Sequence, residues 1–171
     1  MTTNPIPITK GENQRLRWLL KATSPKASGH RAALAGASIE PRAMVATDGF
    51  RLHAIETPYY ARVELEGTVA RFDDLQASSE TVTPTPIEGQ FPDYHVIMPK
   101  GEPVFEIALD GKLLREALEG MKGGVFGKVT LRFYGPTQPV EVFGQANDES
   151  RVYALIMPMH PGHENGEPWR P

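Results

Sequence analysis

Residues 43–56 read Ala-Met-Val-Ala-Thr-Asp-Gly-Phe-Arg-Leu-His-Ala-Ile-Glu, two apolar-rich segments joined by a short polar turn. The pattern predicts strands over 43–47 and 51–56, because these residue types suit a pleated, half-buried surface. Thr47-Asp48-Gly49 between them is a turn signal, since Asp and Gly tolerate positive φ. A hairpin here predicts an antiparallel sheet.

The hairpin completes a first β-α-β-β-β unit. An extended segment over Pro5–Ile8 precedes a helix over Asn13–Thr23, whose leucines recur at helical spacing. Ser24-Pro25 ends the helix, because the residue before proline disfavours helical torsions. A strand over about Ala32–Ile39 then leads into the hairpin.

The second half repeats this order, with a strand over Val104–Leu109, a helix over Asp110–Met121 and strands over Lys128–Tyr134, Val140–Gly144 and Arg151–Met157. The repeat predicts an internal duplication. The expected fold is α+β: two β-α-β-β-β units with pseudo-two-fold symmetry and both helices on one face of an antiparallel sheet. The leucines expected to be buried are Leu16, Leu19, Leu20, Leu113, Leu114 and Leu118.

A single domain over residues 1–160 is expected to contain both halves. Its parts are a first half over about 5–70, a linker over about 71–99 and a second half over about 103–160. Residues 161–171 are rich in Pro, Gly and Glu, and we expect them to form a flexible tail.

Composition narrows the class of protein. The chain has 171 residues, 40% hydrophobic and 23% charged, which is ordinary for a globular protein. It has no cysteine, which excludes disulfides, thiolate nucleophiles and cysteine-ligated metals. No apolar run reaches the ~20 residues of a membrane span, and the first residues do not read as a signal peptide. We therefore expect a soluble, cytoplasmic protein that does not bind membranes.

Catalytic motifs are missing from the sequence. The five histidines lack metal-ligand spacing, and neither a Gly-x-Ser-x-Gly turn nor a phosphate-binding loop occurs. We therefore expect no enzyme, no metal and no cofactor.

Positive charge is concentrated near the amino end. Residues 1–31 hold six bases and one acid, although the whole chain has a net charge of −3. This asymmetry is compatible with one basic face, and equally with the ordinary solvated surface of an amphipathic helix. The six bases are Lys10, Arg15, Arg17, Lys21, Lys26 and Arg31.

Three short segments mix apolar and polar residues at strand ends or turns: Ala46–Leu52, the Phe-Pro-Asp-Tyr of residues 91–94, and Leu155–His160. Each has a purely structural interpretation, respectively a hairpin turn, a cover for a sheet edge and the end of a strand. The methionine pair of the third would also suit an adaptable peptide-binding groove, because thioethers repack around varied ligands.

In this order, the three segments resemble those of the bacterial β sliding clamp, the processivity subunit of the replicative DNA polymerase. That family shows an Ala-Thr-Asp-Gly-x-Arg-Leu turn, a Phe-Pro-Asp-Tyr segment and a Met-Pro-Met ending. The resemblance implies the DNA clamp fold. A typical clamp subunit has three domains, each a pair of β-α-β-β-β units, and two subunits close a ring. This chain has room for one pair, resembling the start of the middle domain and the end of the last.

The resemblance also implies binding sites. The family's cleft takes short peptide motifs from replicative or repair polymerases and from clamp loaders. It maps onto Leu34, Thr47, Gly49, Phe50, Arg51, Leu52, Pro92, Val96, Ile97, Leu155, Ile156, Met157, Pro158 and Met159. In a ring, the bases expected to face double-stranded DNA, without reading its sequence, are Arg15, Arg17, Lys21 and Lys26.

Several points stay open at this level. The two sides of the cleft could come from one chain or from adjacent protomers of a homo-oligomer. The leading hypothesis is a clamp-like protein of DNA replication or repair. The alternative is a peptide-binding module that does not bind DNA and competes for clamp partners, and an enzyme on the same scaffold is a weaker third.

Overall fold

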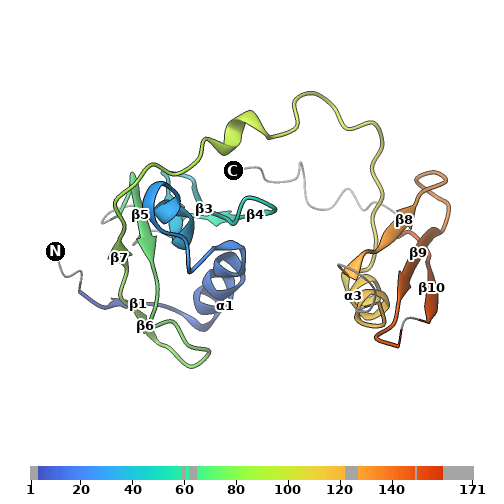
Figure 1. Ribbon diagram of the computed structural model, residues 1–171, viewed down its shortest axis with the longest axis horizontal. Coiled ribbons are helices and arrows are strands. Elements are labelled where there is room, and N and C mark those ends of the chain that lie inside the picture. The colour runs from blue at the N-terminus through green and yellow to red at the C-terminus, as the bar shows by residue number, and fades with distance from the viewer. Residues whose placement is uncertain (1–3, 59–60, 62–64, 122–126, 149, 160–171) are drawn as a thin grey trace. The chain divides into compact units, whose positions relative to one another are not determined.

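A computed structural model describes residues 4–58, 61, 65–121, 127–148 and 150–159. These residues divide into two compact units, one within 4–98 and the other within 99–159, and each is described by itself (Figure 1). No helix among the described residues is long and apolar enough to cross a membrane.

The first unit is built around a five-stranded antiparallel sheet with the order β4-β3-β2-β5-β7. A separate pair joins β1 to β6, with Ile6 opposite Val82. The strands are β1 (Ile6–Pro7), β2 (Ala37–Ile39), β3 (Ala43–Thr47), β4 (Leu52–Glu56), β5 (Thr68–Arg71), β6 (Thr81–Val82) and β7 (Thr85–Pro86). The helices are α1 (Lys10–Leu19) and the 3-10 helices η1 (Leu20–Ala22), η2 (Gly29–Ala35) and η3 (Tyr94–Val96).

Helix α1 begins three residues earlier than expected because Thr9 caps it. The Thr9 hydroxyl accepts the Glu12 N–H at 3.2 Å, and the Glu12 carboxylate accepts the Thr9 N–H at 2.7 Å. This reciprocal capping box satisfies two N–H groups that the first turn leaves free. Further along, the buried amide of Asn13 donates to the carbonyls of Gln76 and Ser79, both at 2.8 Å. The helix is thereby tied to a loop more than sixty residues away.

The predicted hairpin is confirmed: β3 pairs with β4 from Ala43–Glu56 to Thr47–Leu52. Leu16 and Leu19 of α1 are fully buried, with Ile39 and Met44 from the sheet, while Leu20 is half-buried. Burying such side chains is the main favourable term for this unit, at roughly 1.5–3 kcal/mol each.

The strand expected over Ala32–Ile39 is wrong in its first part, since residues 29–35 form η2 and β2 begins only at Ala37. A side chain at Gly36 would lie 2.4 Å from the Ala70 carbonyl oxygen, so the chain approaches β5 closely there. The segment 71–99, expected to be a linker, contributes β6, β7 and the buried Tyr94 to the first unit.

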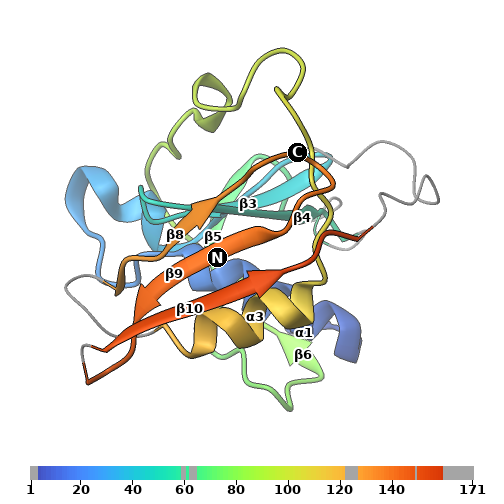
Figure 2. The ribbon, with the colours of Figure 1, turned by 90° about the vertical axis from the view of Figure 1, so that its right-hand side faces the viewer.

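The second unit is a three-stranded antiparallel sheet, ordered β10-β9-β8, with α3 (Gly111–Glu119) beside β10 (Figure 2). The strands are β8 (Thr130–Arg132), β9 (Val140–Gln145) and β10 (Arg151–Ile156). Asp110 caps the helix, because its carboxylate accepts the N–H groups of Lys112 and Leu113 at 2.7 and 3.3 Å. Of the strand expected over Val104–Leu109, the structure shows a single bridge, Ala108 to Met159.

The predicted burial of the α3 leucines is wrong for Leu113 and Leu118, which are 48% and 37% exposed, and Leu114 is half-buried. The stripe that packs on Val140 and Val142 is instead Leu114, Ala117 and Met121, spaced i, i+3 and i+7. The prediction of a single sheet is also wrong for the described strands, because those of the two units form separate sheets. The pseudo-two-fold relation and the single domain over 1–160 stay predictions.

Candidate peptide-binding and DNA-binding surfaces

Residues 47–52 form a tightly bonded turn between β3 and β4, called here the 47–52 turn. The Thr47 hydroxyl donates to the Arg51 carbonyl at 2.7 Å and accepts the Gly49 N–H at 3.1 Å. The Asp48 carboxylate accepts the N–H groups of Phe50 and Arg51 at 2.9 and 3.1 Å. Gly49 has φ +91°, a conformation that side chains other than glycine rarely adopt. The turn is therefore held in one shape from within.

Arg51 ties this turn to the end of the first helix. Its Nε lies 3.0 Å from an Asp48 carboxylate oxygen, and its Nη2 donates to the Lys21 carbonyl. The Phe50 N–H, followed by the N–H and guanidinium of Arg51, holds the pKa of Asp48 below its usual value, against the opposing effect of desolvation. Asp48 is therefore a carboxylate at neutral pH, and Arg51 is already oriented before any ligand binds.

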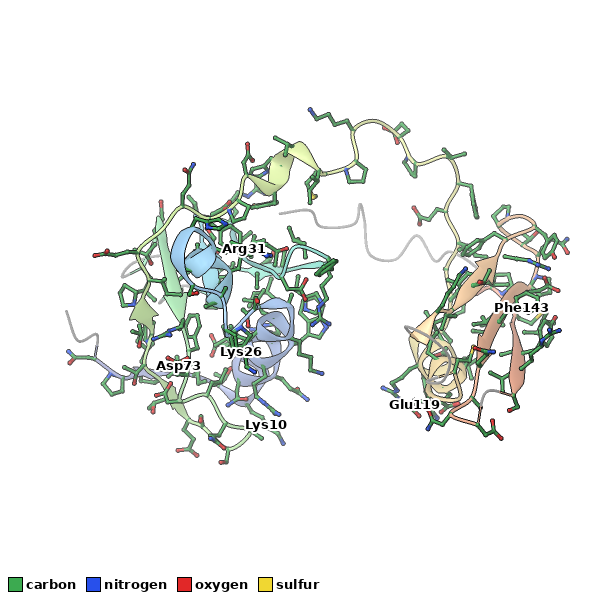
Figure 3. The ribbon with its side chains drawn as sticks, in the orientation of Figure 1. Lys10, Lys26, Arg31, Asp73, Glu119 and Phe143 are labelled. Carbon is green, nitrogen blue, oxygen red and sulfur yellow. The ribbon has the colours of Figure 1, made fainter. Side chains whose placement is uncertain are left out.

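Phe50 is the apolar residue that this turn presents to solvent, with 97% of its surface exposed. Beside it lies an open hollow of about 480 Å³. Two of its lining residues, Lys26 and Arg31, are labelled in Figure 3. The hollow is lined by Thr23, Ser24, Pro25, Lys26, Arg31, Asp48 and Phe50. Sequence reasoning did not place residues 23–25 and Arg31 here, although the basic amino end was a signal for Arg31.

The other cleft residues expected in the first unit fall into two groups. Leu34 is buried, and half-buried Leu52 packs on the cluster of Ala43, Val45 and Tyr94. Pro92, Val96 and Ile97 are exposed, the last two at 68% and 73%. The buried residues thus support the surface, and the exposed ones are available to a ligand.

The Phe-Pro-Asp-Tyr segment is anchored by its tyrosine. The Tyr94 hydroxyl donates to a Glu40 carboxylate oxygen at 3.0 Å, and burial with this carboxylate raises the pKa of Tyr94. Asp93 caps η3 by accepting the His95 N–H at 3.1 Å. This anchoring fixes the backbone from which Val96 and Ile97 project.

In the second unit, the end of β10 carries the remaining predicted residues. Leu155, Met157 and Met159 are 52%, 61% and 53% exposed, and Pro158 is half-exposed. Ile156 is buried against Val140 and Val142, so its side chain packs in the core. The Met159 N–H donates to the Ala108 carbonyl at 2.8 Å, which holds the Met-Pro-Met segment in place.

The predicted DNA-facing bases Arg15, Arg17, Lys21 and Lys26 are all exposed. None of them forms an ion pair with an acid within the described part of the chain. Glu12, near Arg15, is engaged by the backbone of Thr9, which is the main cause that lowers its pKa. In contrast, the bases of α3 are paired, Lys112 with Glu116 at 3.9 Å and Arg115 with Glu119 at 4.0 Å. Available positive charge is therefore concentrated around α1.

Within the described residues, no group of three His, Asp or Glu side chains lies close enough together to hold a metal ion.

No protein-family model and no curated protein sequence matches the chain. Solved structures do. The β sliding clamp of Caulobacter crescentus matches with a TM-score of 0.64 and 18% identity, over 94% of this chain and 52% of that one. The DNA polymerase III subunit beta of Pseudomonas aeruginosa matches with a TM-score of 0.62 and 15% identity, over 94% and 52%. The DNA polymerase III beta chain of Streptococcus pneumoniae gives 0.56 and 15%, over 94% and 50%.

The chain thus spans about half the length of the clamp subunits that it matches. Identities of 15–18% carry the fold and not the activity. The comparison confirms the predicted resemblance: this chain has the fold of the bacterial β sliding clamp.

Proposed function

We propose that this chain is a clamp-like protein of DNA replication or repair that binds short linear peptide motifs from polymerases and clamp loaders. The observation that carries the proposal is the 47–52 turn, which holds Phe50 97% exposed beside an open hollow. The proposal makes the chain a cytoplasmic accessory factor without catalysis of its own.

The physical logic is that of peptide anchoring. A few buried aromatic or aliphatic anchors carry most of the affinity of such interfaces. Phe50, Val96 and Ile97 offer apolar contacts, while Arg51 is oriented in advance by Asp48 to meet a polar part of the peptide. A short ligand that loses conformational freedom on binding is expected to reach the micromolar range, about −8 kcal/mol.

Leu155–Met159 of the second unit is proposed as a further set of peptide contacts. Exposed Met157 and Met159 support it, because methionine side chains adapt to varied apolar ligands. Ile156 is left out of the direct contacts, since it is buried in its own unit.

The test is a titration of the intact chain with a fluorescent pentapeptide rich in Gln, Leu and Phe. Phe50→Ala is expected to weaken binding about tenfold and to leave the melting temperature unchanged, because the ring is not packed. The matched control is Val104→Ala, which truncates a fully exposed apolar side chain elsewhere. Equal binding by wild type and Phe50→Ala would contradict the proposed site.

A second function, sequence-independent binding of double-stranded DNA, is favoured by the exposed bases around α1, which form no ion pair with an acid among the described residues. Arg17→Glu with Lys21→Glu is expected to abolish binding, because phosphate neutralisation supplies most of such affinity. The control is Lys112→Glu with Arg115→Glu, whose charges are already paired on α3. The logarithm of affinity should fall with the logarithm of salt by about 0.9 per phosphate contacted.

The same assay separates the alternatives. Retention on circular DNA that is lost on linearisation is expected of a homo-oligomeric ring. Peptide binding with no DNA binding at low salt would favour the competing module instead. Equal DNA binding by wild type and the α1 variant would contradict the placement of DNA on α1.

A further inference from the structure

Trp18 on α1 and His53 on β4 form a two-ring stack at the surface of the first unit. Their ring centroids lie 4.2 Å apart with only 7° between the planes, and His53 Nδ1 lies 2.8 Å from the Trp18 carbonyl oxygen. Trp18 is nevertheless 47% exposed. Because His53 covers one face of the indole, its exposed area lies on the other face and the edges. The hydrogen bond and the stack together fix the orientation of this flat apolar surface.

Positive charge surrounds the stack. Arg15 and Lys21 lie three residues before and after Trp18, and therefore on the same side of the helix. Arg17 directly precedes Trp18 in the chain. All three bases are exposed, and none forms an ion pair among the described residues. The turn before β4 carries Asp48, whose carboxylate is already paired with Arg51. The acid of β4 itself, Glu56, is exposed and lines a hollow together with Arg15. An aromatic face with exposed cations before and after it along the chain is complementary to a ligand that is both flat and anionic.

We propose that the Trp18–His53 stack is a platform on which a base of single-stranded nucleic acid stacks, with Arg15 and Lys21 contacting the flanking phosphates. The inference rests on the proposed DNA function and deepens it by naming a second nucleic-acid form. In a duplex the bases are stacked on one another and cannot reach an indole, whereas a single strand offers its bases freely. Aromatic platforms within a basic surface are the common solution for binding single strands without reading sequence.

The choice of ligand follows from charge. An uncharged peptide or an apolar partner would leave the nearby cations without anionic partners, whereas a nucleic acid supplies one phosphate with each base. DNA and RNA single strands share this chemistry, so the experiment includes both.

The experiment measures the fluorescence anisotropy of labelled nucleic acids titrated with the full chain. The ligands are oligothymidylate and oligouridylate of about 20 nucleotides and duplex DNA of about 20 base pairs. Trp18→Leu is expected to weaken oligothymidylate binding about tenfold and to change duplex binding less than about twofold. Trp18→Phe, which keeps a stacking ring, is expected to retain most of the affinity. The melting temperatures of both variants show that the unit remains folded.

A spectroscopic readout makes the test independent of stability. In a Trp169→Phe background, Trp18 is the remaining tryptophan of the sequence, and stacking of a base is expected to quench its fluorescence on titration. Quenching by oligouridylate with the same dependence on Trp18 would support the platform and add RNA as a ligand.

Two results would overturn the inference: unquenched Trp18 fluorescence at saturating oligothymidylate, or equal oligothymidylate affinity for wild type and a folded Trp18→Leu variant. If duplex binding persists in either case, the proposed DNA function stands without the platform. If neither single-stranded nor duplex DNA binds, the DNA function itself fails.

Discussion

Asp48 shows how a single residue shapes the candidate peptide site. Its carboxylate accepts two backbone N–H groups and pairs with the Arg51 guanidinium, so that Phe50 and Arg51 are both positioned by one side chain. The Arg51 contact to the Lys21 carbonyl extends this order to the end of the first helix. A surface residue therefore organises groups from two elements that sequence separates by thirty residues.

This arrangement predicts an acid-sensitive turn. Because the pKa of Asp48 is lowered in the folded protein from its ordinary 3.8, the bonds are complete above pH 3.8 and are lost as the pH falls through the lowered value. An NMR titration should show the Phe50 amide shifting with a midpoint below 3.8. Asp48→Asn, which cannot ionise, should remove this transition. A midpoint at or above 3.8 would contradict the hydrogen bonding described for this turn.

At the scale of elements, the two long helices α1 and α3 differ in how deeply their leucines are buried. Leu16 of α1 is fully buried among strands of a five-stranded sheet, whereas Leu118 of α3 is 37% exposed beside a three-stranded one. Leu16→Ala should therefore lower the free energy of unfolding by about 2–5 kcal/mol. Leu118→Ala should cost less, about 1–2 kcal/mol, because Leu118 is only partly buried and its truncation leaves no enclosed cavity. Urea unfolding of the two variants measures this difference, and equal losses would contradict the packing described here.

Elements whose shape depends on residues adjacent in the chain could be predicted from the sequence, and those that depend on distant contacts could not. The β3–β4 hairpin could be predicted because its strands and its Asp-Gly turn are adjacent in the chain. The start of β2 could not be predicted. It follows Gly36, where the backbone approaches Ala70 of β5, a residue distant in the sequence. In the same way, leucine spacing predicted a helix over 110–121 but not its orientation, which depends on what the small sheet can cover.

The same difference holds for the candidate site. The 47–52 turn was found because its residues form a contiguous motif, and the exposure of Phe50 agrees with a role in binding. The hollow beside it and the Trp18–His53 stack were missed, because both join residues from separate elements. Ile156 was expected in the cleft but is buried in the core. Alternation along a strand shows that neighbouring side chains point to opposite faces, but not which face is covered.

At the scale of the whole molecule, the chain matches about half of a clamp subunit and contains two compact units. By resemblance to the family, the proposed peptide contacts are Thr47–Leu52 in the first unit and Leu155–Met159 in the second. The central claim of the proposed function is that a short peptide motif binds at the exposed residues of these segments.

An NMR titration of the isotope-labelled intact chain with an unlabelled pentapeptide rich in Gln, Leu and Phe tests this claim most directly. We expect saturable shifts, with a micromolar dissociation constant, at the amides of Phe50 and Arg51 and also of Met157 and Met159. The absence of saturable shifts at either segment up to millimolar peptide would contradict the peptide contacts proposed there.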